Sequence, residues 1–135
     1  NAFGRSSKAS GTDSIAIGNW SDATNTGATA TGFGSDANGV YSTSNGYNAN
    51  ATAGYSTAVG GFADATGTDS TAVGANSTAN SYNSSAFGIG SSATNYSATA
   101  LGENTSASGV AATAVSSVAL KCPSPPLGRT PKIRR

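Results

Sequence analysis

A phrase of nearly constant form returns every fourteen residues along this chain of 135 residues. It reads "DSIAIGNWS" from residue 13, "YSTAVGGFA" from 55, "DSTAVGANS" from 69 and "NSSAFGIGS" from 83. One position of the unit is strictly glycine, at Gly4, Gly18, Gly32, Gly46, Gly60, Gly74, Gly88 and Gly102. A strict phase of this kind predicts a solenoid, in which each unit forms one coil stacked on the next.

Composition taken alone predicts a disordered chain rather than a solenoid. The chain is 36% hydrophobic, and most of that share is alanine, so little apolar area is available to offset chain entropy. A disordered chain, however, has no reason to keep a regular fourteen-residue repeat. Alanine keeps the same period as glycine in a column from Ala9 to Ala107, and again in a column from Ala2 to Ala114 that Ser44 alone interrupts. The repeat therefore favours a folded chain.

The unit shows period-two alternation twice. With Ser14, Ser42, Ser56, Ser70 and Ser84 as unit position 1, small residues fill positions 1, 3, 5, 8, 10 and 12. This predicts two strands of about five residues per coil, two tight turns, and a thin interior of methyl and hydroxyl groups.

Two positions suggest unusual backbone geometry. We expect position 12 to be a turn with positive φ, because it holds residues that tolerate it: Gly11, Asn25, Gly39, Gly67, Asn95 and Gly109. For the glycine at position 5 the sequence leaves two explanations open, either positive φ at the other turn or close packing.

The outward positions differ between the two strands. Positions 2 and 4 form a β-branched, mostly apolar stripe, whereas positions 9 and 11 are polar. An alanine-rich interior buries little apolar area against the entropy of ordering the chain, so we expect the stripe to be covered by other copies. The predicted oligomer interface comprises Ile15, Ile17, Val59, Thr71, Val73, Phe87 and Leu101, with a wetter stretch at Thr31 and Asn45.

The pattern Ser-x-Ala-hydrophobic-Gly-x-x-Ser-x-Ala-x-Gly, clearest in "DSIAIGNWSDA", "DSTAVGANSTA" and "NSSAFGIGSSA", resembles the head repeats of trimeric autotransporter adhesins, the YadA-like heads. The resemblance implies a left-handed parallel β-roll that associates as a homotrimer on the cell surface. It also implies attachment to extracellular matrix such as collagen, to host cells or to other bacteria. Similar repeats occur in surface fibres of virions, so the localisation is extracellular in either case.

The resemblance covers residues 1–116, which we expect to form the β-roll head. Residues 117–135 hold Cys122, all four prolines and five of the seven basic residues, and are expected to be a disordered tail. Cys122 is expected to be a free thiol rather than an intersubunit disulfide. The neck, stalk and membrane barrel of the family are not present, which suggests a fragment whose anchor lies elsewhere.

Aromatic residues gather at the expected turns and are candidate ligand contacts. Their alternative role is to cap the turns or to pack between subunits. They are Trp20, Phe33, Tyr47 and Phe62 at one turn, and Tyr41, Tyr55, Tyr82 and Tyr96 at the other.

The aspartates Asp22, Asp36 and Asp64 share position 9, where a solvated acidic edge is favoured over a cation site. N-glycosylation sequons occur at Asn19, Asn50, Asn76, Asn83, Asn95 and Asn104, scarcely above the number expected by chance.

The sequence gives no support to catalysis. It contains no histidine, and its acidic residues follow the repeat rather than forming pairs. No cofactor, metal or nucleic-acid partner is predicted, and a membrane would be reached only through the absent anchor. Three functions remain: an adhesive module, a structural fibre segment of a viral or bacterial appendage, and an ice-binding solenoid suggested by the threonines at position 2.

Overall fold

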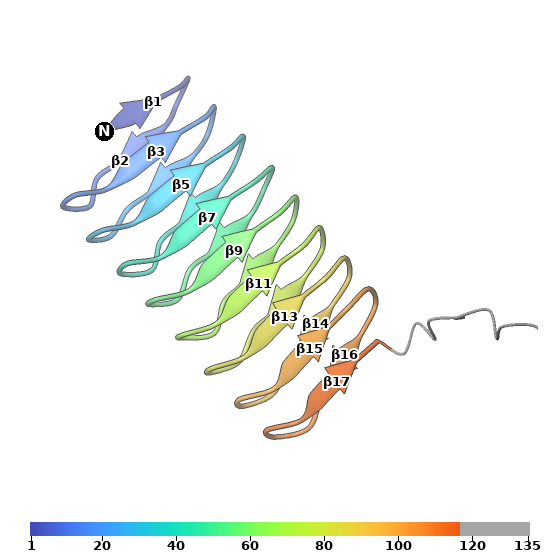
Figure 1. Cartoon of the computed structure of the whole chain (residues 1–135). Helices are drawn as coiled ribbons and strands as arrows, with labels where there is room; N and C mark the ends of the chain where they lie inside the picture. The colour runs from blue at the N-terminus through green and yellow to red at the C-terminus, as the bar shows by residue number, and fades with distance from the viewer. Residues whose placement is uncertain (117–135) are drawn as a thin grey trace, which may run out of the picture.

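The computed structural model describes residues 1–116, and over this range the chain winds into a parallel β-roll (Figure 1). The predicted tail and Cys122 lie outside the described residues. Each coil adds one strand to a nine-stranded sheet and one to an eight-stranded sheet. Within residues 1–116 no helix is long and apolar enough to span a membrane.

The nine-stranded sheet consists of β1 (Ala2–Phe3), β3 (Ile15–Ile17), β5 (Thr29–Thr31), β7 (Thr43–Asn45), β9 (Thr57–Val59), β11 (Thr71–Val73), β13 (Ser85–Phe87), β15 (Thr99–Leu101) and β17 (Thr113–Val115). The eight-stranded sheet consists of β2 (Lys8–Ala9), β4 (Asp22–Ala23), β6 (Asp36–Ala37), β8 (Asn50–Ala51), β10 (Asp64–Ala65), β12 (Thr78–Ala79), β14 (Ser92–Ala93) and β16 (Ser106–Ala107).

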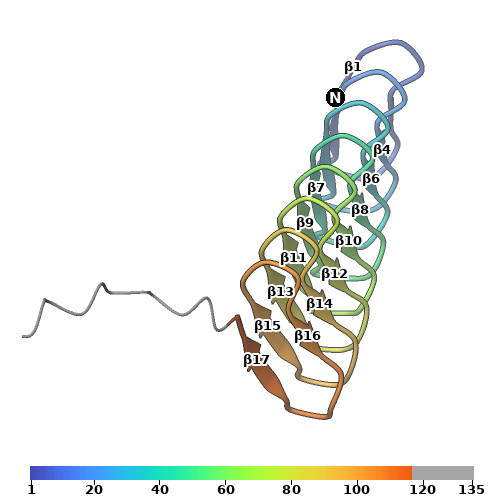
Figure 2. The ribbon, with the colours of Figure 1, turned by 90° about the vertical axis from the view of Figure 1, so that its right-hand side faces the viewer.

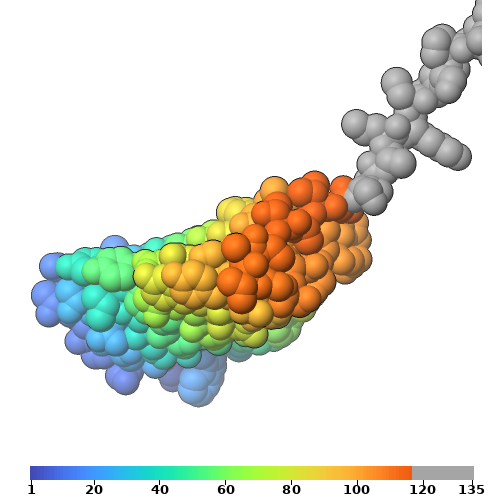
Figure 3. All heavy atoms as spheres, turned by 90° about the horizontal axis from the view of Figure 1, so that it is seen from below, coloured from blue at the N-terminus to red at the C-terminus, as the bar shows by residue number. Residues whose placement is uncertain are grey.

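Every strand pairs in parallel with its equivalent in the next coil, as Ala72 of β11 does with Ala86 of β13. The two sheets form the opposite walls of the roll (Figure 2), and the colours follow one another along an elongated body (Figure 3). The predicted parallel β-roll with two strands per coil is confirmed. Coils are numbered here by their position-5 glycine, from Gly4 in coil 1 to Gly102 in coil 8.

The strands are shorter than the five residues expected. They have three residues on one wall and two on the other, except for the two-residue β1 at the start. The first turn joins position 4 to position 9, and the second joins position 10 to position 2 of the next coil. Both turns still donate backbone hydrogen bonds to the neighbouring coil, as Trp20 does to the Arg5 carbonyl, so the ladder continues outside the strands.

Positions 1, 3, 8 and 10 form the interior. Alanines at these positions are almost all fully buried, and the largest fully buried side chains among the described residues are serines. The predicted interior of methyl and hydroxyl groups is therefore present. The largest interior side chain is that of Thr105 in coil 8, so only small residues fit between two walls joined by such short turns.

The interior serines also stabilise the turns. The Ser21 hydroxyl donates to the Gly18 carbonyl at 2.9 Å, and the Ser77 hydroxyl donates to the Gly74 carbonyl at 2.8 Å. Where alanine replaces this serine, it fits the same space, but the glycine carbonyl then accepts only the backbone N–H and lacks the hydroxyl hydrogen bond. Ser44, the exception in its alanine column, donates across the interior to the Ala49 carbonyl at 2.8 Å. Its buried hydroxyl is thereby satisfied.

The position-5 glycine is required for both reasons that the sequence left open. Gly74 has φ 132°, and a Cβ built on it would lie 2.4 Å from the carbonyl oxygen of Gly88 in the next coil. The left-handed backbone and the close approach of successive coils thus both exclude a side chain.

The expectation of positive φ at position 12 is wrong. Positive φ occurs instead at positions 7 and 14, including Trp20 at 63° and Tyr41 at 54°. Three glycines at position 12, Gly11, Gly39 and Gly67, serve close packing, since a Cβ on Gly39 would lie 1.8 Å from the Ala53 carbonyl oxygen. Sequence composition pointed to the wrong position because bulky residues rarely adopt the left-handed region.

Candidate functional site

The outer side of the nine-stranded sheet, formed by positions 2 and 4, is called here the apolar face. Strict register places each predicted interface residue beside its equivalent, as in the pairing of Val73 with Val59 and Phe87. These side chains point outward and are exposed or half-buried: Ile15, Ile17, Val59, Thr71, Val73, Phe87 and Leu101. Thr31 and Asn45 interrupt the stripe on neighbouring strands.

The outer side of the eight-stranded sheet, formed by positions 9 and 11, is called here the polar face. Asp36 pairs in register with Asp22 on one side and Asn50 on the other. Burial and the neighbouring Asp22 carboxylate raise the pKa of Asp36, and a hydrogen bond from the Asn38 side chain partly offsets the rise.

Several side-chain oxygens on this face have no partner. One oxygen each of Asp22, Asp36 and Asn50 is buried without a hydrogen bond among the described residues. The Asn50 amide donates to Asp64 at 3.0 Å, and the Thr24 hydroxyl donates to the Asn38 side chain. In residues 1–116 no three acidic or cysteine side chains are grouped as a metal site would need.

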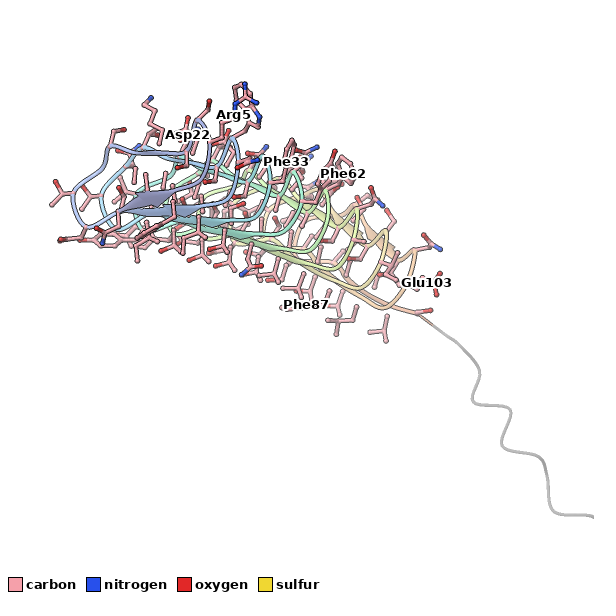
Figure 4. All side chains as sticks on the ribbon, turned by 90° about the horizontal axis from the view of Figure 1, so that it is seen from above. Arg5, Asp22, Phe33, Phe62, Phe87 and Glu103 are labelled. Carbon is pink, nitrogen blue, oxygen red and sulfur yellow. The ribbon has the colours of Figure 1, made fainter. Side chains whose placement is uncertain are left out.

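The first turn carries an aromatic row. The rings of Phe33 and Tyr47 stack with centroids 5.5 Å apart, and Phe62 meets Tyr47 edge-on at 5.2 Å. All three side chains are about half exposed. Trp20 is exposed at the same turn one coil earlier. Figure 4 shows Asp22, Phe33 and Phe62 along one side of the roll and Phe87 on the other.

The second turn carries two separate tyrosine pairs. Tyr41 stacks on Tyr55 at 5.6 Å, and Tyr82 stacks on Tyr96 at 5.4 Å. The Tyr41 ring also lies over Gly27, where a Cβ would approach the ring to 2.5 Å. The structure thus brings seven of the eight predicted aromatic residues together as one row and two pairs, at opposite edges of the roll, and leaves Trp20 outside these ring contacts.

Backbone strain makes four of these aromatic residues unusual. Trp20, Tyr41, Tyr55 and Phe62 occupy the left-handed region, with φ between 54° and 63°. In most other coils the same positions hold glycine, asparagine or aspartate, which tolerate this conformation at lower cost, and the exceptions are the small residues Ser6, Ser97 and Ala111. The rings are therefore not explained by the requirements of the turn, and their outward surfaces are candidates for contact with a partner.

Exposed aliphatic residues in these turns were missed from the sequence. Ile89 lies in the first turn at the unit position of Phe33 and Tyr47, and Val40 and Val110 lie in the second turn at the position of Tyr82. The signal was available, because each shares a unit position with a selected aromatic residue.

Comparison with known proteins agrees with this architecture. The family described as YadA head domain repeat (2 copies) matches residues 2–19, 9–35, 37–63, 65–91 and 93–115. The chain belongs to the YadA head repeat family.

Among solved structures, the crystal structure of the collagen-binding domain of the Yersinia adhesin YadA superposes with a TM-score of 0.58. The match has 27% sequence identity and covers 93% of this chain and 78% of that one. No curated protein sequence matches the chain. Family membership makes this YadA-like chain an adhesin head module of the surface-exposed, extracellular kind, and it points to a role other than catalysis.

Proposed function

We propose that this YadA-like chain is a homotrimeric adhesive module that attaches to extracellular matrix, such as collagen, or to cell surfaces. The observation that carries this proposal is the set of outward aromatic rings on a rigid, alanine-filled roll of an adhesin head family. Repeated contacts along such a rod would add through avidity. The solved YadA relative is a collagen-binding domain, which supports collagen as the first ligand to test.

The apolar face supports the trimer. Large side chains such as Ile17 and Phe87 lie exposed on it in a single chain. Full burial of a side chain of this size contributes about 1.5–3 kcal/mol, and because Ile17 and Phe87 are already more than half buried, covering the remainder contributes about half of that or less. The interior consists almost entirely of alanine and serine, so additional apolar burial must come from the outer surface, and the stripe offers it in register along one face of the roll.

The first experiment is analytical ultracentrifugation of the full chain at micromolar concentration, where we expect a single trimeric species. The second is solid-phase binding of that species to collagen, laminin and fibronectin. Replacing Phe33, Tyr47 and Phe62 together by alanine should weaken binding while leaving the trimer intact. A trimer that binds no matrix protein would favour the fibre-segment function, and a stable monomer that inhibits ice recrystallisation would favour the ice-binding one.

A further inference from the structure

The first turn changes its chemistry along the roll. In coils 3 to 5 it carries the aromatic strip, defined as Phe33, Tyr47 and Phe62, whose rings touch in sequence. In coils 6 to 8 the residues equivalent to Phe33 are Ala75, Ile89 and Glu103. The strip is therefore a local feature of one half of the roll rather than a requirement of the repeat.

Carboxylates accompany the strip on the adjoining edge of the polar face. Asp36 follows Phe33 by three residues, and Asp64 follows Phe62 by two, which places each pair around the same corner of a coil. Figure 4 shows the equivalent Asp22 on the same side of the roll as Phe33 and Phe62. Beyond coil 5 the acidic position becomes Thr78, Ser92 and Ser106.

Among residues 1–116, no basic residue is in register with Asp36 or Asp64, whereas Lys8 is in register with Asp22. Residues 1–116 contain six acidic and two basic residues, and both basic residues, Arg5 and Lys8, belong to coil 1. The in-register neighbours of Asp36 are Asp22 and Asn50, and those of Asp64 are Asn50 and Thr78. One oxygen of Asp36 is buried without a hydrogen-bond donor in the part of the chain that the structure describes.

Aromatic rings beside unneutralised carboxylates match the chemistry of a guanidinium group. Its plane stacks on an aromatic ring, and its N–H groups pair with carboxylate oxygens. An uncharged apolar segment would leave the carboxylates unpaired, and lysine stacks less well than arginine. Three coils span roughly 10 Å, a length that about four residues of extended chain can follow.

We propose that the aromatic strip, together with Asp36 and Asp64, docks an arginine-rich extended segment of a partner protein. This inference rests on the proposed adhesive function and specifies the chemistry of its partner. The carboxylates lie on the sheet opposite the apolar face, so formation of the proposed trimer would leave them open.

The test is fluorescence anisotropy of a labelled oligo-arginine peptide titrated with the full chain, at low salt and at physiological ionic strength. We expect binding that salt weakens, and oligo-lysine of equal length should bind several-fold more weakly. The Phe33→Ala/Phe62→Ala double variant should lose about tenfold in affinity. Asp36→Asn should lose about fivefold.

Matched controls come from the second turn. Tyr82→Ala/Tyr96→Ala removes another stacked and exposed aromatic pair, and Asp69→Asn removes another carboxylate. Both should leave the affinity for oligo-arginine unchanged, and circular dichroism should show that all variants remain folded.

Equal losses in the two sets of variants, equal binding of oligo-lysine, or no binding of oligo-arginine would each overturn the inference. The adhesive function is assessed separately, because a chain that binds collagen as a trimer but not oligo-arginine loses only this inference.

Discussion

The two outer faces of the roll are built on one interior and yet present opposite chemistry. The apolar face shows Ile17, Val73 and Phe87, whereas the polar face shows Asp22, Asp36 and Thr78. Alternation along each strand separates the two roles: inward positions must be small, and outward positions are free to vary. The comparison teaches that the chemistry of either outer face can change on this scaffold without disturbing the coil.

Breaking the interior should damage both faces at once and gives the largest effect. Gly74→Ala places a Cβ against the Gly88 carbonyl in a left-handed backbone, and we expect a loss of about 3 kcal/mol or more in unfolding free energy. Thermal unfolding followed by circular dichroism measures it. Gly61→Ala is the control, because its Cβ would meet only the Tyr47 carbonyl at 3.9 Å. Equal melting of the two variants would contradict this account of the glycine column.

Placing a charge on each face of the same coil tests the assignment of the faces. Val73→Asp should replace the proposed trimer by monomers at micromolar concentration, because a buried, unpaired carboxylate is strongly unfavourable. Thr78→Asp should leave the trimer intact, since aspartate already occupies this position in Asp22, Asp36 and Asp64. Analytical ultracentrifugation separates the outcomes. A trimeric Val73→Asp variant would place the interface elsewhere.

Two interior serines of coil 6, one behind each outer face, differ in their hydrogen bonding. Ser77, before the strand of the polar face, donates to Gly74. The buried Ser70 hydroxyl, before the strand of the apolar face, has no partner within residues 1–116. Ser77→Ala should therefore lower the unfolding free energy by about 1 kcal/mol, and Ser70→Ala should leave it unchanged or raise it. Denaturant unfolding of both variants measures these free energies. A larger loss for Ser70→Ala than for Ser77→Ala would show that the Ser70 hydroxyl forms a hydrogen bond in solution.

The polar face should also give the roll a small dependence on pH. The pKa of Asp36 is raised in the folded state, so the folded chain binds this proton more tightly than the unfolded chain does. Aspartates of an unfolded chain titrate at about 3.9. Stability from this group is therefore present at low pH and falls as pH rises from about 4 through the raised pKa.

Asp36→Asn should remove that dependence and raise stability at neutral pH by less than about 1 kcal/mol, because solvent screens the site. Melting temperatures from pH 3 to pH 8 measure it, with Asp69→Asn as the control. A variant that keeps the slope of the parent chain would assign the pH dependence to other groups.

Most of the architecture could be predicted from the period. The columns of glycine, alanine and serine predicted two strands per coil, the parallel stacking and the interior, because only small side chains fit between walls so close together. The apolar and polar faces follow from alternation around Val73 and Thr78. The ladder of Asp22, Asp36 and Asn50 was likewise predictable from their shared position, but its unpartnered oxygens were not.

Sequence alone therefore determined the register, because residues fourteen apart must stack once the coil length is fixed. Tertiary structure decided where the backbone turns left-handed and which rings touch. Phe62 contacts Tyr47 although the two occupy different unit positions, and they are fifteen residues apart. The physical reason is that a period specifies which coil a side chain belongs to, whereas its direction depends on the φ at that position, which at Phe62 is 58°.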